Sequence, residues 1–263
     1  MKLFLTGDQG DVGSMLAEVL RSEGAEITGN ISEADRVFHM AAKSPPSSAT
    51  DIITSNLVYL QEILDKCLSG KVRDFIFFSA ASVYGDNPSG VLTEDSPCYE
   101  ASLYGASKLM GESMIRESGI NALCLRIPAV LGLKNTTNLP SRIFCRAERN
   151  EDIVLYNSDK EFSNFISVNE IAGFISVLRP LEGFDIVNLR TGAVTTLGGM
   201  AEKVVAVTGS SSFVDRKNTP KPFFSLSIDK AVKKYDFSPC RDMSHFDEWV
   251  RKRHMMHKNG VLS

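Results

Sequence analysis

Two side chains that could move a proton lie one helical turn apart near the middle of the chain. Tyr104 and Lys108 are four residues apart in a segment with helical spacing, so they share one face of the predicted helix. An ammonium group beside a phenol favours the phenolate, so we expect Lys108 to lower the pKa of Tyr104. Such a tyrosine can exchange a proton with a hydroxyl while a hydride moves to or from a nicotinamide, and the same ammonium can hold the cofactor ribose. Taken alone, the pair favours an exposed helical face that has no function.

A glycine-rich turn near the start of the sequence predicts the place of a cofactor. The apolar run 3–5 predicts a buried strand, and apolar residues recur at helical spacing from residue 12 until Gly24. Between them, the first glycine permits a tight turn, the second lets a phosphate approach the backbone, and the third lets the helix pack on the sheet. The helix start offers N–H groups and a positive dipole end to a pyrophosphate, whereas the alternative is a purely structural turn. The residues assigned to this cofactor site are Gly7, Gln9, Gly10, Asp11, Val12 and Gly13.

Composition excludes several classes of function. With 263 residues, 43% hydrophobic and 23% charged, the chain has the make-up of a soluble globular protein of one large domain, or of a main domain with a small lobe. A net charge of −3 gives no electrostatic reason to expect nucleic acid or an anionic membrane as partner. No apolar run reaches membrane-spanning length, and no signal peptide precedes the first strand. The 5 scattered cysteines predict reduced thiols and no metal site. We therefore expect a cytoplasmic protein.

Strands and helices alternate along the first half of the chain. This order predicts an α/β fold, a Rossmann-type doubly wound parallel sheet with helices on both faces. Strands are predicted at 25–28, 35–42, 74–79 and 122–126, and helices at 51–68 and 103–116. Shorter elements beyond Gly132 predict a small C-terminal α/β substrate lobe. Residues 1–132, with part of 160–190, are therefore assigned to the dinucleotide-binding domain, and residues 133–263 mainly to the lobe.

The segment after the second predicted strand bears on the choice of cofactor. Dinucleotide folds usually place an acidic residue there to hold the adenosine ribose, and this chain has Asn30. Asparagine can hydrogen-bond a ribose without repelling a 2′-phosphate, and no arginine stands beside it, so NAD and NADP both stay open. The next strand begins at residue 35, which leaves no room for the usual strand-and-helix unit. The adenine side of the site is therefore unusually short.

Several motifs resemble those of one known family over nearly the whole chain. Residues 6–13 resemble the TGxxGxxG turn, residues 39–42 an HxAA strand end, residues 78–85 an SSxxVYG segment, and residues 104–108 the YxxxK signature. Asn56 and the segments 138–140, 164–168 and 224–230 resemble further landmarks. On these motifs the chain is identified as a member of the extended short-chain dehydrogenases/reductases, in the nucleotide-sugar epimerase/dehydratase group that includes UDP-galactose 4-epimerase.

The resemblance implies a cofactor, a substrate and site residues. The cofactor would be NAD or NADP, the small-molecule substrate a nucleotide sugar, and the assembly a homodimer formed through helices 51–68 and 103–116. Tyr104 and Lys108 would transfer the proton and contact the cofactor, with Ser79 or Ser82 as the catalytic hydroxyl. The further cofactor residues implied are Asn30, Ala41, Ala42 and Pro128, and the substrate residues are Ser79, Tyr84, Asn138 and Leu139.

Three departures from the family pattern bear on activity. Ala80 stands where the family has its catalytic serine or threonine; Ser79 and Ser82 flank it, although strand alternation points Ser79 to the other face. Ala129 replaces a substrate-contacting asparagine. Ser163 replaces an arginine that commonly contacts the nucleotide diphosphate, for which Arg142 or Arg146 could substitute.

Two classes of function follow. The first is an NAD(P)-dependent enzyme whose net reaction is epimerisation or dehydration of a nucleotide sugar, with 4-keto reduction as the alternative. The second, favoured by Ala80, is a cofactor-binding protein with degraded catalysis. Among weaker candidates, we expect His39 to be a packed residue, Tyr99 to lie near the cleft, and the basic run 251–258 to be a solvated helix end.

Overall fold

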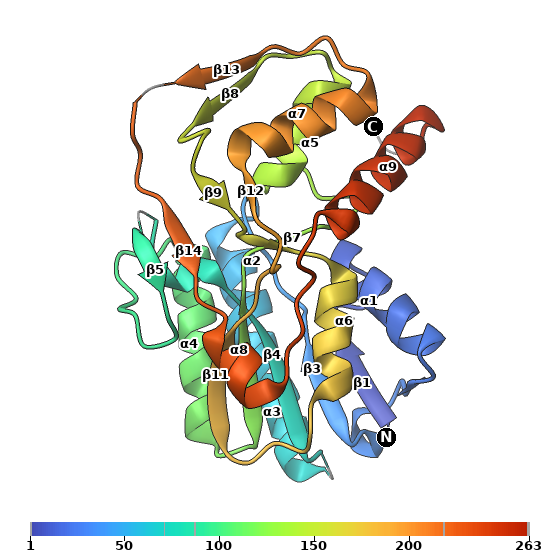
Figure 1. The fold of residues 1–263 in the computed structure, drawn as a ribbon. Coiled ribbons are helices and arrows are strands. Elements are labelled where there is room, and N and C mark those ends of the chain that lie inside the picture. Colours follow the sequence, from blue (N-terminus) through green and yellow to red (C-terminus); the bar gives the residue numbers. More distant parts are fainter. Residues whose placement is uncertain (1, 71, 87, 218, 262–263) are drawn as a thin grey trace.

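The computed structural model describes residues 2–70, 72–86, 88–217 and 219–261, and within them the central element is a parallel sheet (Figure 1). The sheet has 6 strands in the order β11-β6-β4-β3-β1-β2, and every neighbouring pair is parallel. In that order the strands span Phe184–Asn188, Ala122–Ile127, Asp74–Ala80, Arg36–His39, Lys2–Thr6 and Glu26–Ile27. The predicted doubly wound α/β fold is confirmed.

Helices cover both faces of this sheet, which explains why its strands are almost continuously apolar. On one face, α1 (Asp11–Ser22) and α6 (Val168–Val177) pack against alternate strand residues such as Ile76 and Leu125. On the other, α3 (Tyr59–Ser69) and α4 (Leu103–Ser118) pack against the intervening residues, such as Phe75 and Cys124. The two pairs of helices flank the sheet in the lower half of Figure 1.

A second hydrophobic cluster forms the upper part of the molecule in Figure 1. It is built mainly by α5 (Leu139–Glu148), α7 (Leu197–Thr208), α9 (Ser244–Lys258) and the paired strands β8 (Ile153–Tyr156) and β13 (Val214–Lys217). Its core contains Phe144, Met200, Phe246 and Trp249. We propose that this cluster is the core of the substrate lobe. The smaller elements are β5 (Gly90–Leu92), β7 (Ala129–Val130), β9 (Glu161–Phe162), β10 (Phe165–Ile166), β12 (Thr195–Thr196), β14 (Phe224–Leu226) and α8 (Asp229–Tyr235).

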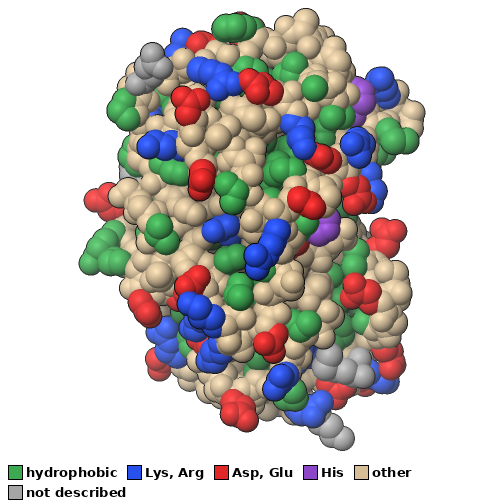
Figure 2. All heavy atoms as spheres, viewed as in Figure 1, with side chains coloured by type: hydrophobic (Ala, Val, Ile, Leu, Met, Phe, Trp, Pro, Cys, Tyr) green, Lys and Arg blue, Asp and Glu red, His purple; other side chains and the backbone are tan. Residues whose placement is uncertain are grey.

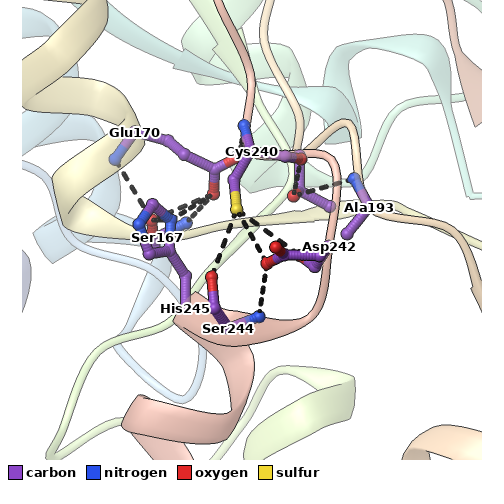
Figure 3. A network of polar contacts seen from close by, with 8 residues as sticks. Ser167, Glu170, Ala193, Cys240, Asp242, Ser244 and His245 are labelled. Carbon is purple, nitrogen blue, oxygen red and sulfur yellow. Dashed lines mark hydrogen bonds and ion pairs between the residues drawn. The ribbon is translucent and has the colours of Figure 1, made fainter.

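The segment between α8 and α9 is fastened to the start of α6 (Figure 3). Ser167 and Glu170 form a capping box at the N-terminus of α6. Glu170 Oε1 also accepts a hydrogen bond from the Cys240 N–H (3.1 Å), and Ser167 Oγ lies 3.0 Å from His245 Nδ1. One helix start therefore ties the end of the chain to the sheet domain.

Three elements differ from their sequence-based predictions. The helix predicted over 51–68 is divided into α2 (Ala49–Ile53), a π-helical turn η2 (Thr54–Val58) and α3. The basic run near the end of the chain is not wholly solvated, because Arg253 is 2% exposed, lies 4.8 Å from the Phe144 ring and donates to Ser141 Oγ (2.9 Å). The second strand is only Glu26–Ile27, shorter than predicted.

The surface shows no segregation of charge on the face drawn in Figure 2, where acidic and basic side chains are interspersed. Across the described ranges, no helix combines the length and apolar character needed to cross a membrane.

A buried ion pair joins α4 to the sheet. Arg126 on β6 donates to both carboxylate oxygens of Glu112 on α4, at 3.0 Å and 2.8 Å, and Ser79 on β4 donates to Glu112 Oε1 at 2.6 Å. Glu112 and Arg126 are 2% and 3% exposed. The pair thus fixes α4 against β4 and β6, the strands whose ends carry the candidate site.

Replacing Glu112 by alanine should strongly destabilise the protein, because it leaves the Arg126 charge buried without a partner. Loss of one member of such a pair costs about 3–5 kcal/mol. Urea unfolding of Glu112→Ala, beside the exposed-site control Glu117→Ala, measures this. Equal stabilities of the two variants would contradict the role given to the pair.

Candidate functional site

A cleft of about 910 Å³ lies at the carboxyl ends of β1, β3, β4 and β6. This is the edge at which open α/β sheets bind their ligands, and the volume suits a ligand of cofactor size. A second cavity of about 420 Å³ lies at the amino ends of β6 and β11, and it contains none of the predicted site residues. Of the predicted residues, the cleft is lined by Gly7, Gly10, Asp11, Val12, Gly13, Ala41, Ala42, Ser79, Ser82, Tyr104, Lys108, Pro128, Asn138 and Leu139.

The glycine turn has the close backbone approaches that exclude side chains. Gly7 has φ +75°, and a Cβ there would lie 2.7 Å from the Ala41 backbone nitrogen. A Cβ on Gly13 would lie 2.1 Å from the Gly7 carbonyl oxygen, whereas one on Gly10 would lie 3.2 Å from that atom and otherwise meets open space. Gly7 and Gly13 are therefore required by the fold, while Gly10 leaves room above the backbone for a ligand.

The start of α1 fits the pyrophosphate of a dinucleotide. The Gly10 N–H donates to the Gly7 carbonyl (3.0 Å), and no side chain of the described residues caps the helix. The N–H groups of Asp11, Val12 and Gly13 thus have no intrahelical acceptor. These residues line the cleft at the positive end of the helix dipole, which would hold a pyrophosphate by backbone hydrogen bonds.

Tyr104 and Lys108 lie on one face of α4 and line the same cleft. Ser102 caps the helix by accepting from the Gly105 N–H, so the tyrosine lies in its first turn. Lys108 is 2% exposed, its Nζ donates to the Phe78 carbonyl (2.8 Å), and this nitrogen lies 5.9 Å from the Tyr104 ring centroid. The predicted pairing on one helical face is therefore present in the structure.

The expected effect of Lys108 on the phenol is wrong. Burial raises the pKa of Tyr104 to about 12, and burial lowers the pKa of Lys108 to about 8. The ammonium faces the Phe78 carbonyl instead of the phenol oxygen, so burial outweighs charge. Near pH 7 the site therefore contains a neutral phenol and a lysine that is still mostly cationic.

Ser79 and Ala80 end β4, Ser82 lies in the following 3₁₀ turn η3 (Ala81–Tyr84), and all three line the cleft. The Ser79 hydroxyl is committed to Glu112, so a catalytic or substrate-binding Ser79 is not supported, in agreement with the alternation of the strand. Ala80 lines the cleft and has no donor. Ser82 Oγ is buried and has no partner among the described residues, so this hydroxyl is free to bind a ligand or a water.

Four other predicted residues lie outside the cleft. Asn30 caps the 3₁₀ turn η1 (Ile31–Glu33), and its Oδ1 accepts from the Ser32 N–H (3.1 Å). Gln9 is exposed and donates to Asp8 (3.2 Å). Tyr84 is 4% exposed, and its hydroxyl donates to Asn188 Oδ1 at the end of β11 (2.7 Å). Tyr99 is 72% exposed and does not line the cleft.

Several other residues line the cleft although no motif in the sequence indicated them. Lys43, Ser55 and Asp86 line the cleft, and the backbone of Lys43 is held by Asn56, whose Oδ1 accepts from its N–H (2.8 Å). Asn56 lies in the π-helical turn η2 and also donates to Ser107 Oγ on α4 (2.9 Å). Lys43 directly follows the HxAA segment in the sequence, and this position could have indicated its place in the cleft. His39 of that segment is packed as expected, and burial lowers its pKa to about 3.

The lobe side of the cleft is uncharged and partly aromatic. It is lined by Phe162 and Phe224, by the asparagines Asn135, Asn138 and Asn164, and by Leu139. Asn138 caps α5, so the positive end of that helix dipole faces the cleft. Arg142 and Arg146 are exposed and do not line the cleft. Neither therefore substitutes for the arginine that the family pattern has where this chain has Ser163.

The glycine turn, the parallel sheet and the cleft at its carboxyl edge together define a Rossmann-type dinucleotide-binding fold. Residues 29–188 match the model of the NAD dependent epimerase/dehydratase family. This match covers more than half of the chain, and the chain belongs to that family. The matched range begins after the glycine turn, so the role of the turn rests on its geometry.

Two curated relatives are similar to part of this chain. A UDP-glucose 4-epimerase of Azospirillum brasilense is 33% identical over 117 residues, 42% of this chain and 31% of the relative. An uncharacterized UDP-glucose epimerase of Bacillus subtilis is 24% identical over 165 residues, 59% of this chain and 52% of the relative. The chain thus spans about a third to a half of the length of these curated relatives.

Two solved structures share the fold over almost their whole length. The UDP-glucuronic acid 4-epimerase of Bacillus cereus in complex with NAD aligns with a TM-score of 0.81 at 18% identity, covering 98% of this chain and 99% of that chain. The UDP-glucose 4-epimerase of Thermotoga maritima with UDP-glucose aligns with a TM-score of 0.78 at 18% identity, covering 99% and 100%.

Two glycine substitutions should distinguish a glycine that the fold requires from one that leaves room for a ligand. Gly13→Ala places a methyl group against the Gly7 carbonyl and should lower stability by several kcal/mol or prevent folding, whereas Gly10→Val should cost only about 1 kcal/mol, as for a poor N-cap. Thermal unfolding of both variants measures this difference. A Gly10→Val protein less stable than Gly13→Ala would show that the turn is packed differently.

Proposed function

We propose that the chain binds NAD or NADP in this cleft and oxidises or reduces a carbon of a nucleotide-linked sugar. The observation that carries the proposal is the burial of the Lys108 ammonium in the cleft that also contains the Tyr104 phenol and the free N–H groups of α1. A buried ammonium without a carboxylate partner is costly, and a cofactor ribose would give it acceptors. The NAD bound by the similar Bacillus cereus structure supports the choice of cofactor.

Tyr104 is the proposed acid and base. A bound nicotinamide supplies or accepts the hydride. With a pKa of about 12, the neutral phenol would donate a proton to a carbonyl oxygen in the direction of reduction, which leaves the phenolate; in the direction of oxidation the phenolate would accept the proton from the substrate hydroxyl. Ala80 supplies no second donor, so Ser82, whose hydroxyl has no partner among the described residues, is the proposed replacement. With a cofactor bound, Lys108 would leave the Phe78 carbonyl for the ribose hydroxyls, and from there it would stabilise negative charge developing on the phenol oxygen.

The lobe side of the cleft supports a nucleotide sugar as substrate. The N-terminus of α5, at Asn138 and Leu139, offers a dipole end to a diphosphate, and Phe162 and Phe224 offer aromatic surface to a base. UDP-glucose lies in the similar Thermotoga maritima structure. These features replace part of the contact that an arginine at position 163 would have made.

Epimerisation or 4-keto reduction suits the cleft better than dehydration. Elimination of water needs a further acid–base group near the reacting carbon. The lining carboxylates are Asp11 and Asp86, and Asp11 accepts from the Lys134 and Asn135 N–H groups (3.0 Å and 2.9 Å). Asp86 is exposed at the rim. A non-catalytic cofactor-binding protein is the second candidate, and Ala80 is the observation that favours it.

We also propose a cytoplasmic homodimer. Helix segments α2, η2 and α4 lie side by side and expose Ile53, Val58, Leu103 and Met110, at 44%, 50%, 46% and 55%. Unpartnered apolar side chains on neighbouring helices favour pairing with a second copy of the chain.

Removing the phenol hydroxyl should stop turnover and leave cofactor binding intact. Tyr104→Phe should lower turnover by roughly 10²–10⁴-fold, the range for loss of a general acid or base. Ala80→Ser should raise turnover if the second donor is limiting and change little if Ser82 or a water supplies it. UDP-, dTDP- and GDP-sugars and their 4-keto derivatives are assayed with both cofactors. If neither wild type nor Ala80→Ser turns over any of them, the non-catalytic candidate takes the place of the enzyme.

The pH dependence of kcat/KM should reflect the loss of the proton from Lys108. Its pKa is lowered to about 8, so the ammonium is present below pH 8 and is lost above it, while Tyr104 stays protonated throughout this range. The kcat/KM for reduction should therefore fall above pH 8. In Lys108→Met most activity should be lost together with this pH dependence. An unchanged alkaline limb in the variant would assign the limb to another group.

Charges on the exposed helical face should break the dimer. Val58→Glu combined with Met110→Glu should convert a dimer to a monomer, because burying two carboxylates at an apolar interface is costly. Val194→Glu, at a residue 59% exposed outside these helices, is the control. Light scattering at micromolar concentration measures the mass. A wild type that is already monomeric refutes the interface.

A further inference from the structure

The outermost strand of the sheet stops short of the cleft. Strand β2 pairs with the beginning of β1, with Glu26 opposite Lys2 and Ile27 opposite Leu3. Strand β3 pairs with β1 as far as Thr6, three residues beyond Leu3. At about 3.3 Å per residue, β2 therefore ends roughly 10 Å below the level at which the glycine turn begins.

The connection from β2 to β3 also stays at the amino end of the sheet. The Thr28 N–H donates to the Leu3 carbonyl (2.8 Å), and the Asp35 N–H donates to the Lys2 carbonyl (2.9 Å). Between them, Ser32 of η1 lies against Gly70, just beyond the end of α3 and before β4 begins. No residue between 25 and 38, all of them described, lines the cleft.

The part of the cleft that β2 and its following loop do not line corresponds to one half of a dinucleotide-binding site. In doubly wound folds, the first strands and the loop after the second strand form the half that binds the adenosine, while the other half binds the nicotinamide riboside. In this chain the first half keeps the glycine turn and the segment Met40–Lys43 but has no wall from β2. The nicotinamide half keeps Tyr104, Lys108 and Pro128.

The residue expected to read the adenosine ribose is committed elsewhere. Asn30 Oδ1 accepts from Ser32 N and Ser32 Oγ (3.1 Å and 2.8 Å), and its Nδ2 donates to Glu33 Oε1 (3.2 Å). Neither a carboxylate for two ribose hydroxyls nor a cation for a 2′-phosphate stands in its place.

We propose that the chain holds its dinucleotide by the pyrophosphate and the nicotinamide riboside and leaves the adenosine unheld. Reduced nicotinamide mononucleotide is then an adequate ligand, and NADH and NADPH bind alike. This inference rests on the proposed function, because it concerns the same cleft. A cofactor bound by one half also exchanges readily between turnovers, which favours a net reductase over an epimerase that retains its cofactor until the hydride returns.

Calorimetric titration of the full chain tests the proposal with four ligands: NADH, NADPH, reduced nicotinamide mononucleotide and AMP. We expect the Kd values of NADH and the mononucleotide to agree within about tenfold, those of NADH and NADPH to agree within about tenfold, and AMP to show no binding at millimolar concentration. A larger ratio in either comparison, or AMP binding, overturns the proposal while leaving the proposed function intact. If neither NADH nor the mononucleotide binds, the proposed function itself is refuted.

Two matched variants sharpen the test. Asn30→Asp keeps a good capping residue on η1 and should leave the Kd of NADH within about twofold of wild type, since residue 30 lies away from the cleft. Gly10→Val should abolish binding of both NADH and the mononucleotide, because its side chain occupies the phosphate position. If Asn30→Asp tightens NADH by more than that, the adenosine ribose reaches residue 30 and the proposal is wrong.

Discussion

The site depends on the ion pair between Glu112 and Arg126, buried where α4 crosses the sheet. Tyr104, Lys108 and Glu112 succeed one another at intervals of four residues, so one helical face carries the phenol, the ammonium and the carboxylate. Pairing with Arg126 and Ser79 presses that face against β4 and β6. The same contact buries Lys108 at the strand ends, where its ammonium donates to the Phe78 carbonyl and lies 4.8 Å from the centroid of the Phe77 ring. A structural ion pair therefore leaves one cation in need of acceptors at the edge where a ligand binds.

The cleft is asymmetric as a consequence of the fold around this face. The proposed nicotinamide end has the buried lysine, the phenol and Pro128. The proposed adenosine end lacks the wall that a longer β2 would supply. Its lobe end has aromatic surface and the dipole of α5 but no cationic side chain among the described lining residues. The proposed chemistry is thus concentrated where α4, β4 and α1 meet.

Local sequence patterns were sufficient to predict the features that depend on residues close together in the chain. The glycine turn, the start of α1 and the shared face of Tyr104 and Lys108 depend on spacing alone. The alternation of β4 also indicated that the Ser79 hydroxyl turns to the other face, where it donates to Glu112, although Ser79 was still assigned to the site. The sequence could not show that Asn30 lies away from the cleft, because this depends on the level at which β2 pairs with β1. Nor could it show that Tyr84 bonds Asn188, a residue 104 positions away. The pKa of Tyr104 was misjudged because burial, a tertiary property, outweighs a lysine whose ammonium faces a carbonyl.

The most direct test of the account is a crystal structure of the protein with NADH. The account predicts that the pyrophosphate lies on the N–H groups of residues 11–13 and that Lys108 Nζ leaves the Phe78 carbonyl for the hydroxyls of the nicotinamide ribose, beside Tyr104. A complex in which Lys108 keeps the Phe78 carbonyl and the nicotinamide lies away from Tyr104 would contradict it.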